Sequence, residues 1–318
     1  MQVLEKLNSQ GVIYALHRKK ENSMHYKKYD NHYTVEQYAG EDAVVSIPVA
    51  WEQLPVTGIE AKAFLSCKSI YELSLPDTIE EVGDWAFAHM KNLKVLHVPA
   101  KAISFGKHVF MGCEQLEQVC VQGDTSGNEG LSYLLASVLT ILRDMTLFAP
   151  ERAADALSCK SWMAEYDEGL LRFLDSPNDI GFEPVFFGWF DVEDIDVQHE
   201  AFVKERQKEK LRVVLLRLIY AWRLADDVKK PLQQYLLSYM PEEQRCREDS
   251  LLLELLREKY NQDVRYVKAL ADSGCITIQN ISIIMEVLAD GAPEVLAYLI
   301  QFQQSLGNGQ DYFAELTL

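Results

Sequence analysis

Apolar side chains return at a fixed interval in the first part of the chain, between Ile59 and Val121. Phe64, Phe87 and Phe110 stand 23 residues apart, and other apolar positions keep the same interval. The matching sets are Ile59, Val82 and Phe105; Ala63, Ala86 and Val109; Ile70, Leu93 and Leu116; and Leu73, Leu96 and Val119. A fixed period in the twenties is typical of a solenoid in which each repeat contributes one short strand and a return segment.

The repeats end in strands that a proline closes. Leu96-His97-Val98 alternates in polarity, and Pro99 ends the ladder because it has no N–H group to donate. The interval from Pro48 to Pro76 is 28 residues, which is longer than the later period of 23. We therefore expect a bulged return loop around Trp51–Pro55 in the first full repeat.

The repeat pattern predicts a domain over residues 33–124, with about four strands at the 23-residue period. Tyr33–Tyr38 and Val44–Ile47 read as strands at its start. We expect residues 1–32 to form an N-terminal cap, because an exposed terminal strand would present unpaired backbone groups.

One repeat, VGDWAFAHMKNLKVLHVP at residues 82–99, shows the full pattern I/V-G-x-x-A-F-x-x-C/M-x-x-L-x-x-L-x-L/V-P. This pattern resembles the BspA-type leucine-rich repeat, and YTVEQYAGEDAVVSIP at residues 33–48 is similar to the start of such arrays. The resemblance covers residues 33–121. It implies a leucine-rich-repeat solenoid, and it links the chain to a family in which cell-surface adhesion is one role.

The hydrophobic spacing changes after the polar, turn-rich stretch at residues 122–128. Apolar residues between Leu131 and Leu142 then follow the i, i+3, i+4, i+7 rule of an amphipathic helix. Further helices are expected at residues 151–157, 161–174, 194–224, 229–239, 248–260, 263–272, 278–289 and 293–305. The segment 211–222 is apolar nearly all round, which predicts a central buried helix. The predicted fold class is α+β, a short leucine-rich-repeat solenoid followed by an all-helical domain at residues 128–318.

The formal net charge of -17 narrows the classes of partner that we expect. An acidic chain repels phosphate backbones, which argues against a nucleic-acid partner. No stretch of about 18 uncharged apolar residues occurs, so we expect no membrane span. Glu5 and Lys6 interrupt the opening segment where a secretion signal needs an apolar core, so we expect a cytoplasmic protein if Met1 is the native start.

Motifs for catalysis, metal binding and cofactor binding do not emerge from the sequence. His199-Glu200 would begin a zinc-protease motif, but position 203 is Val where the second His must stand. The cysteines form no C-x-x-C pair, and no glycine-rich phosphate loop occurs. We therefore expect no cofactor, no metal and no catalytic residue.

The predicted strands place one set of side chains on the exposed concave face of the solenoid. The set, named here the strand strip, consists of Ser46, Glu72, Ser74, Val95, His97, Gln118 and Cys120. Repeat proteins commonly bind through this face, although a short array can also simply expose a mixed polar surface. Four strands about 4.8 Å apart present about 300 Å², whereas a stable interface needs about 800 Å² per partner. We therefore expect a tight partner to contact the helical domain as well.

A second candidate surface is the aromatic run that begins at Phe182. It contains Phe182, Phe186, Phe187, Trp189 and Phe190. Such a run can line a groove for a peptide or an apolar ligand, or it can pack its own loop onto the domain.

These observations favour a non-catalytic intracellular protein-interaction or scaffold module with a protein partner. One alternative is that the helical domain is an enzyme or a small-ligand domain, with the repeats as a recognition arm. Another is a secreted or surface adhesin. The sequence leaves the partner, the biological process and the oligomeric state open.

Overall fold

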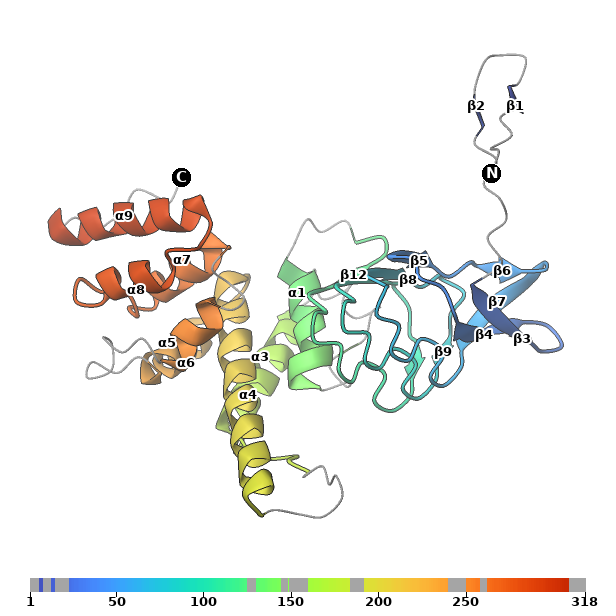
Figure 1. The fold of residues 1–318 in the computed structure, drawn as a ribbon, viewed down its shortest axis with the longest axis horizontal. Coiled ribbons are helices and arrows are strands. Elements are labelled where there is room, and N and C mark those ends of the chain that lie inside the picture. Colours follow the sequence, from blue (N-terminus) through green and yellow to red (C-terminus); the bar gives the residue numbers. More distant parts are fainter. Residues whose placement is uncertain are drawn as a thin grey trace. The chain divides into compact units, whose positions relative to one another are not determined.

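The computed structural model describes residues 6–7, 13–14, 23–124, 130–143, 148, 160–183, 192–239, 250–257 and 262–308. The chain forms two compact units that divide near residue 125 (Figure 1). The first unit contains the strands, and the second contains the helices. The predicted limits of the cap and of the two domains stay predictions.

A parallel sheet of four strands forms one side of the solenoid, in the order β12-β10-β8-β5 (Figure 1). Its strands are β5 (Val44–Ser46), β8 (Glu72–Ser74), β10 (Val95–Val98) and β12 (Gln118–Val121). Residues at equivalent repeat positions stand opposite each other, as in Leu73, Leu96 and Val119. The prediction of about four strands at a 23-residue period is confirmed.

The other side of the solenoid is a second sheet, in the order β11-β9-β7-β4-β3. Its strands are β3 (Met24–Lys28), β4 (Tyr33–Tyr38), β7 (Leu54–Ile59), β9 (Glu81–Val82) and β11 (Ser104–Phe105). Strand β3 is antiparallel to β4 and ends the sheet, with a register shift between His25 and Tyr26. Exposed lysines are a usual protection of an edge strand, and Lys27 and Lys28 on β3 are exposed.

An aromatic ladder of buried rings runs through the first unit. Phe64 lies 5.7 Å from Phe87, and Phe87 lies 5.6 Å from Phe110, between ring centroids. Tyr38, on β4, extends the ladder by stacking on Phe64 at 5.4 Å. The 23-residue apolar period is therefore a column of touching side chains, one from each turn of the solenoid.

The return segments repeat a backbone conformation as well as a sequence pattern. Two positions in each turn have positive φ and are again spaced by the period: Lys62, Trp85 and His108, and then Ser66, His89 and Gly112. Backbone bonds join successive return segments, for example Phe64 N–H to Ala86 O at 2.8 Å and Phe87 N–H to Val109 O at 3.2 Å. Left-handed residues cost about 1–2 kcal/mol each when a Cβ is present, and these bonds between turns offset that cost.

The extra residues in the first full repeat form a β-hairpin between β6 (Ala50–Trp51) and β7. Glu52 and Gln53 make its turn, with φ of 44° and 69°, which matches the twist that a two-residue hairpin requires. The predicted bulged loop at Trp51–Pro55 is thus an ordered hairpin. It is held by Tyr33, whose hydroxyl donates to Glu52 Oε2 at 2.6 Å, and by Trp51 stacking on Tyr26 at 4.7 Å.

The described residues near the N-terminus make a separate two-stranded pair. Strand β1 (Lys6–Leu7) runs antiparallel to β2 (Ile13–Tyr14). This pair precedes β3 in the chain and belongs to the segment that we expect to cap the solenoid.

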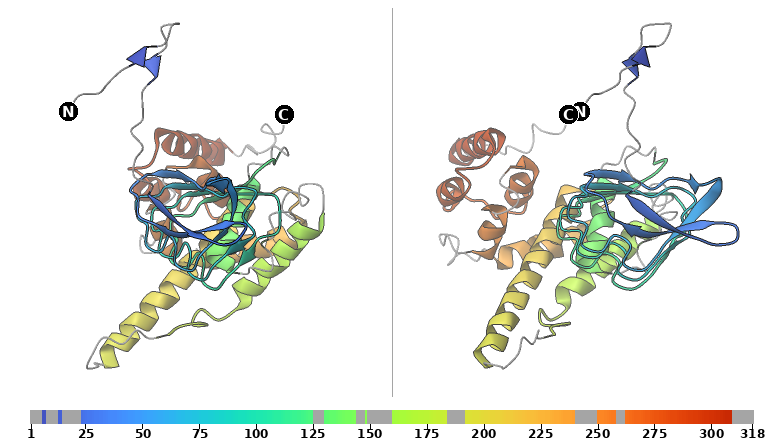
Figure 2. Two further views of the ribbon diagram at one scale, coloured as in Figure 1. Left: turned by 90° about the vertical axis from the view of Figure 1, so that its right-hand side faces the viewer. Right: turned by 45° about the vertical axis from the view of Figure 1, so that its right-hand side comes forward.

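The second unit is helical, as predicted. Its elements are α1 (Gly130–Ser137), the π-helical turn η1 (Val138–Leu142), α3 (Lys160–Asp175), α4 (Val192–Ile219), α5 (Asp226–Ser238), α6 (Leu251–Leu255), α7 (Val264–Asp272), α8 (Ile281–Val287) and α9 (Pro293–Asn308). Helices α8 and α9 lie side by side (Figure 2). The helix expected at 151–157 lies outside the described residues. None of the described helices is both long and apolar enough to cross a bilayer.

Helix α4 is the central element of this unit, as the apolar segment predicted. Leu211, Val213 and Val214 are fully buried, and α4 contacts α1, η1, α3, α5, α6 and α7. It ends at Ile219, before the expected residue 224, because the buried guanidinium of Arg217 donates to Tyr220 O at 2.7 Å and to Trp222 O at 3.3 Å.

A buried ion pair joins α4 to α3. Arg217 Nε donates to Asp167 Oδ1 at 2.6 Å, and its Nη2 donates to Oδ2 at 3.0 Å. Beside it, Tyr166 and Ser137 share a hydrogen bond of 2.8 Å between their hydroxyls. Two-point pairing of a guanidinium and a carboxylate fixes the relative rotation of the two helices.

Substitution of Gly112 tests how tightly the return segments stack. A Cβ at Gly112 would lie 2.4 Å from His89 Nδ1, whereas a Cβ at Gly123 would meet nothing within 4 Å. Both glycines have positive φ, so Gly123→Ala reports the backbone strain alone. We expect Gly112→Ala to lower the free energy of unfolding by about 2–3 kcal/mol and Gly123→Ala by about 1 kcal/mol, measured by urea denaturation. Equal losses would mean that the stacked turns are loosely packed.

The buried ion pair is tested by a double-mutant cycle. Arg217→Met leaves the Asp167 carboxylate buried without its partner, so we expect a loss of about 3–5 kcal/mol in the free energy of unfolding. Arg217→Met combined with Asp167→Leu should lose less than the sum of the two single changes, because neither charge is then left unpaired.

The matched control for this cycle is the pair Arg172–Glu168, which is exposed and lies on the same helix as Asp167. Arg172→Met should change the free energy of unfolding by under about 0.5 kcal/mol. Additive losses at Arg217 and Asp167 would contradict the proposed coupling.

Candidate functional site

The strand strip lies across the four parallel strands in two rows. Ser46, Ser74, His97 and Cys120 stand opposite one another in one row. Glu72, Val95 and Gln118 stand in the other, two residues earlier on each strand. All seven side chains are half-buried or exposed, and the residues between the rows, such as Leu73 and Leu96, are fully buried. The structure thus brings the predicted strip together on one face.

His97 and Glu72 are joined across two strands of the strip. His97 Nε2 lies 2.9 Å from Glu72 Oε1, and both side chains are about one-third exposed, at 31% and 34%. The imidazole reaches diagonally toward β8, away from Cys120 on β12. This contact holds the two ionisable polar side chains of the strip, other than the Cys120 thiol, in one arrangement.

A further row of residues lies beside the strip and was not predicted from the sequence. Ala43, Tyr71, Lys94 and Glu117 directly precede the four strands, and each backbone N–H donates to the previous C=O: Tyr71 to Ala43 at 2.7 Å, Lys94 to Tyr71 at 2.8 Å and Glu117 to Lys94 at 3.0 Å. Tyr71 is 45% exposed, with Lys94 Nζ 5.7 Å from its ring centroid. Val44, at the end of the Glu72 row, is 59% exposed.

The signal for this row was present in the sequence, since positions 71, 94 and 117 keep the 23-residue period. We did not expect it because strand alternation concerns positions within the strands. Tyr71 and Val44 add apolar area to a strip that is mostly polar, and such a mixture is typical of a protein-interaction surface.

The aromatic run is described only at its first member. Phe182 packs against α4, with its ring centroid 5.0 Å from His199 and 5.5 Å from Phe202. This contact agrees with packing of the loop onto its own unit. Phe186, Phe187, Trp189 and Phe190 lie outside the described residues, and the groove stays a prediction.

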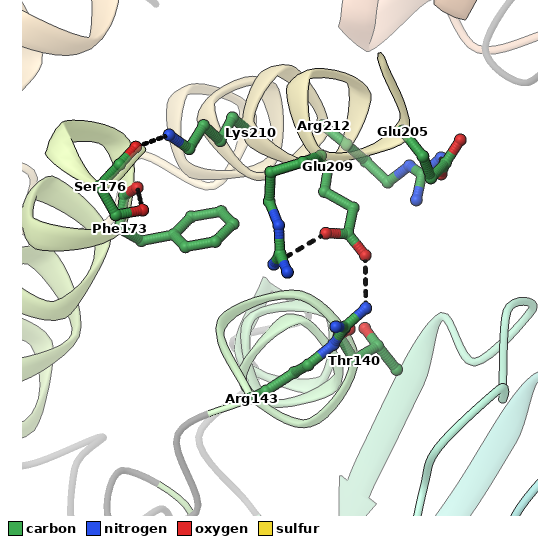
Figure 3. Close-up of polar contacts among 9 residues, drawn as sticks. Thr140, Arg143, Phe173, Ser176, Glu205, Glu209, Lys210 and Arg212 are labelled. Carbon is green, nitrogen blue, oxygen red and sulfur yellow. Dashed lines mark hydrogen bonds and ion pairs between the residues drawn. The ribbon is translucent and has the colours of Figure 1, made fainter. Parts of the chain in front are cut away.

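The helical unit contains a cluster of charged side chains on α4 and its neighbours (Figure 3). Arg143 Nη2 donates to Glu209 Oε1 at 2.7 Å, and Arg206 Nη1 lies 3.1 Å from Glu209 Oε2. Lys210 Nζ donates to Leu174 O at 3.1 Å and to Ser176 O at 2.5 Å, so it satisfies carbonyls at the end of α3.

Burial dominates the electrostatics of this cluster. Desolvation raises the pKa of Glu209 although Arg143 and Arg206 act in the opposite direction, and it lowers the pKa of Arg206 and of Lys210. The charged groups are nevertheless paired with one another or with helix carbonyls. Such a network joins α4 to its neighbouring helices. Among the described residues, no group of three or more His, Cys, Asp or Glu side chains is arranged to hold a metal ion.

The repeat segment matches a known family. Residues 50–132 match the model of the BspA type leucine rich repeat region (6 copies). These residues are a BspA-type leucine-rich repeat region. The resemblance predicted from the sequence is confirmed for this part of the chain, and leucine-rich repeats imply a protein-binding or recognition module.

Solved structures similar to the chain are also leucine-rich repeat proteins. A leucine rich repeat protein of T. pallidum is 23% identical, with a TM-score of 0.30, over 35% of this chain and 56% of that one. A leucine rich cell surface protein from Faecalibacterium prausnitzii A2-165 is 24% identical, with a TM-score of 0.28, over 32% of this chain and 30% of that one. The chain therefore spans little more than half of the first protein and less than a third of the second. No curated protein matches the chain.

The cysteines of the leucine-rich repeat region differ in accessibility. Cys113 is buried beneath the return segments, and burial raises the pKa of its thiol to about 12. Cys120 is half-buried on the strip, and its pKa is raised by burial, then by the negative charges of Glu72 and Asp124. Cys120 is thus a protonated thiol that can report on the strip and is not an activated nucleophile.

Alkylation of Cys120 tests the predicted influence of Glu72. Glu72→Gln removes a negative charge that raises the thiol pKa, so the thiolate fraction near pH 8 should rise. We expect iodoacetamide to modify Cys120 about twofold faster in this variant, as followed by peptide mass spectrometry. Glu114→Gln, on a return segment, should leave the rate unchanged. A rate that is the same in both variants would show that Glu72 does not influence the thiol.

Proposed function

We propose that the chain is a non-catalytic protein-interaction module and that the strand strip, together with Tyr71 and Val44, contacts its partner. The single observation that carries this proposal is the in-register exposure of the strip on four parallel strands. Each exposed row is backed by fully buried residues such as Leu73 and Leu96, so the surface is rigid before a partner arrives. Pre-organisation of this kind reduces the entropy that binding must overcome.

The chemistry of the surface fits a protein better than a polyanion. Hydroxyl, imidazole, carboxylate, amide and aromatic groups alternate within it, and the whole chain carries a net charge of -17. Both signs of charge are present, at Glu72 and Lys94. A partner of mixed polarity can hydrogen-bond the rows and cover Tyr71 and Val44.

An intracellular setting is part of the proposal. Cys67, Cys113 and Cys120 are free thiols, which is the usual state of cysteines in a reducing compartment. The charged cluster around Glu209 supports a structural rather than an enzymatic helical unit, because Arg143, Arg206 and Lys210 are engaged in holding helices.

The experiment is capture of a partner from lysate of the source cell, followed by measurement of its affinity for two matched variants. Ser74→Arg places a bulky cation in the middle of the strip, whereas Ser66→Arg makes the same change at an exposed return turn of the same repeat. We expect Ser74→Arg to lower the affinity for the captured partner by about tenfold or more, which is the loss typical of a change at the centre of an interface.

Ser66→Arg should retain the affinity of the unmodified chain. A partner that binds both variants equally would refute the strip as the binding surface. A partner weakened only by Ser66→Arg would move the site to the return segments.

A further inference from the structure

Strand β5 has an open edge beside the strip. It ends the four-stranded sheet, and β8 is its one neighbour among the described strands. Tyr71 N–H and Glu72 N–H donate to Ala43 O, and Ile47 N–H donates to Ser74 O, so alternate residues of this segment face β8. Because backbone groups alternate along a strand, the N–H and C=O groups of Val44 and Ser46 point away from β8.

The open edge of β5 is short and is followed by Pro48, but its three residues are uncharged. Both Val44 and Ser46 are exposed, and Val44 and Val49 expose 59% and 56% of their surface. Strand β5 contains no lysine, in contrast to β3 at the edge of the other sheet, which carries Lys27 and Lys28. An apolar edge with unpaired backbone groups is a template for another strand.

The β1–β2 pair is a small sheet that would be stabilised by a further strand, just as the edge of β5 can accept one. Its ladder is two residues long, from Lys6 opposite Tyr14 to Leu7 opposite Ile13. An isolated two-stranded pair is at best marginally stable in water, and it becomes stable when it joins a larger sheet. Strand β2 lies in the apolar run Val12–Leu16, which has high strand propensity.

We propose that the β1–β2 pair docks on the outer edge of β5, so that the sheet continues through β2 to β1. The chain is long enough for this docking. Ser23 is fixed beside Ala39 by the 2.7 Å bond from Ala39 N–H to Ser23 O. Val44 follows five residues later, within about 18 Å, and the nine steps from Tyr14 to Ser23 reach about 30 Å.

Two other edges, those of β3 and β12, fit β2 less well. Strand β3 carries Lys27, Lys28 and a register shift, which disfavour a further strand. Strand β12 lies three strands beyond β5, about 14 Å further away, at the limit of the reach. Docking at β5 extends the strand strip at its Val44 end, and it gives the predicted cap of residues 1–32 a specific contact.

Amide hydrogen exchange on the full chain, read residue by residue by NMR, tests the docking. The disrupting variant is Ile13→Pro combined with Tyr14→Pro, since proline removes the N–H groups that pair. We expect the amides of Val44 and Ser46 to exchange at least about tenfold faster in this variant, because only docked edges protect outward amides. Two prolines at Lys19 and Lys20, between β2 and β3 in the sequence, should leave both amides protected.

Three results would overturn the proposal. Val44 and Ser46 amides that exchange equally fast in all variants would show an open edge. Faster exchange at Tyr26 and Lys28 instead would place β2 on β3. Protection that depends on protein concentration, with a dimer by size-exclusion chromatography, would make a second copy the occupant. The readout requires no binding partner, so its outcome is independent of the proposed function.

Discussion

The structure of the first unit depends on the stacking of one solenoid turn on the next. A single turn contributes one short strand and a return segment, and it cannot surround its own apolar side chains. In the column from Tyr38 to Phe110, Phe64 and Phe87 have ring neighbours on both sides, each supplied by another turn. The same stacking supplies the backbone bonds that hold residues such as Trp85 and His89 at positive φ. The ring column, the backbone hydrogen bonds between turns and the positive-φ turns therefore depend on one another.

The exposed surface follows from the same constraint. Stacking in register buries Leu73, Leu96 and Val119 one above the other, so the alternate residues must share the opposite face. The strand strip is thus an obligatory consequence of the repeat, whereas its composition is free to vary. His97 and Glu72 use that freedom by forming a contact across strands. A surface whose scaffold is fixed and whose side chains are interchangeable is well suited to recognition.

The features that follow the 23-residue period could be predicted from the sequence. The interval of 23 residues located the ring column and the strip, because equivalent positions in a solenoid must be neighbours in space. It missed Tyr71 and its row, which lie outside the strands, and it described an ordered hairpin at Glu52–Gln53 only as a bulge.

In the helical unit, helical spacing predicted the buried face of α4 but not the partner of Arg217. Asp167 is 50 residues away from Arg217, and the spacing within one helix carries no information about its rotation against another. The end of α4 at Ile219 also could not be predicted from helical spacing, since it involves hydrogen bonds from Arg217 to the carbonyls of Tyr220 and Trp222.

Ends are the weakness of any stacked fold, because the last turn on each side has no neighbour to pair with. At the same end of the solenoid, the two sheets have different edge strands. Strand β3 closes one sheet with exposed lysines and a register shift, and these features discourage further pairing. Strand β5 leaves Val44 and Ser46 with outward backbone groups and exposed apolar surface. Strand β5 thus offers an edge to a further strand, and β1–β2 is a sheet fragment too small to be stable alone.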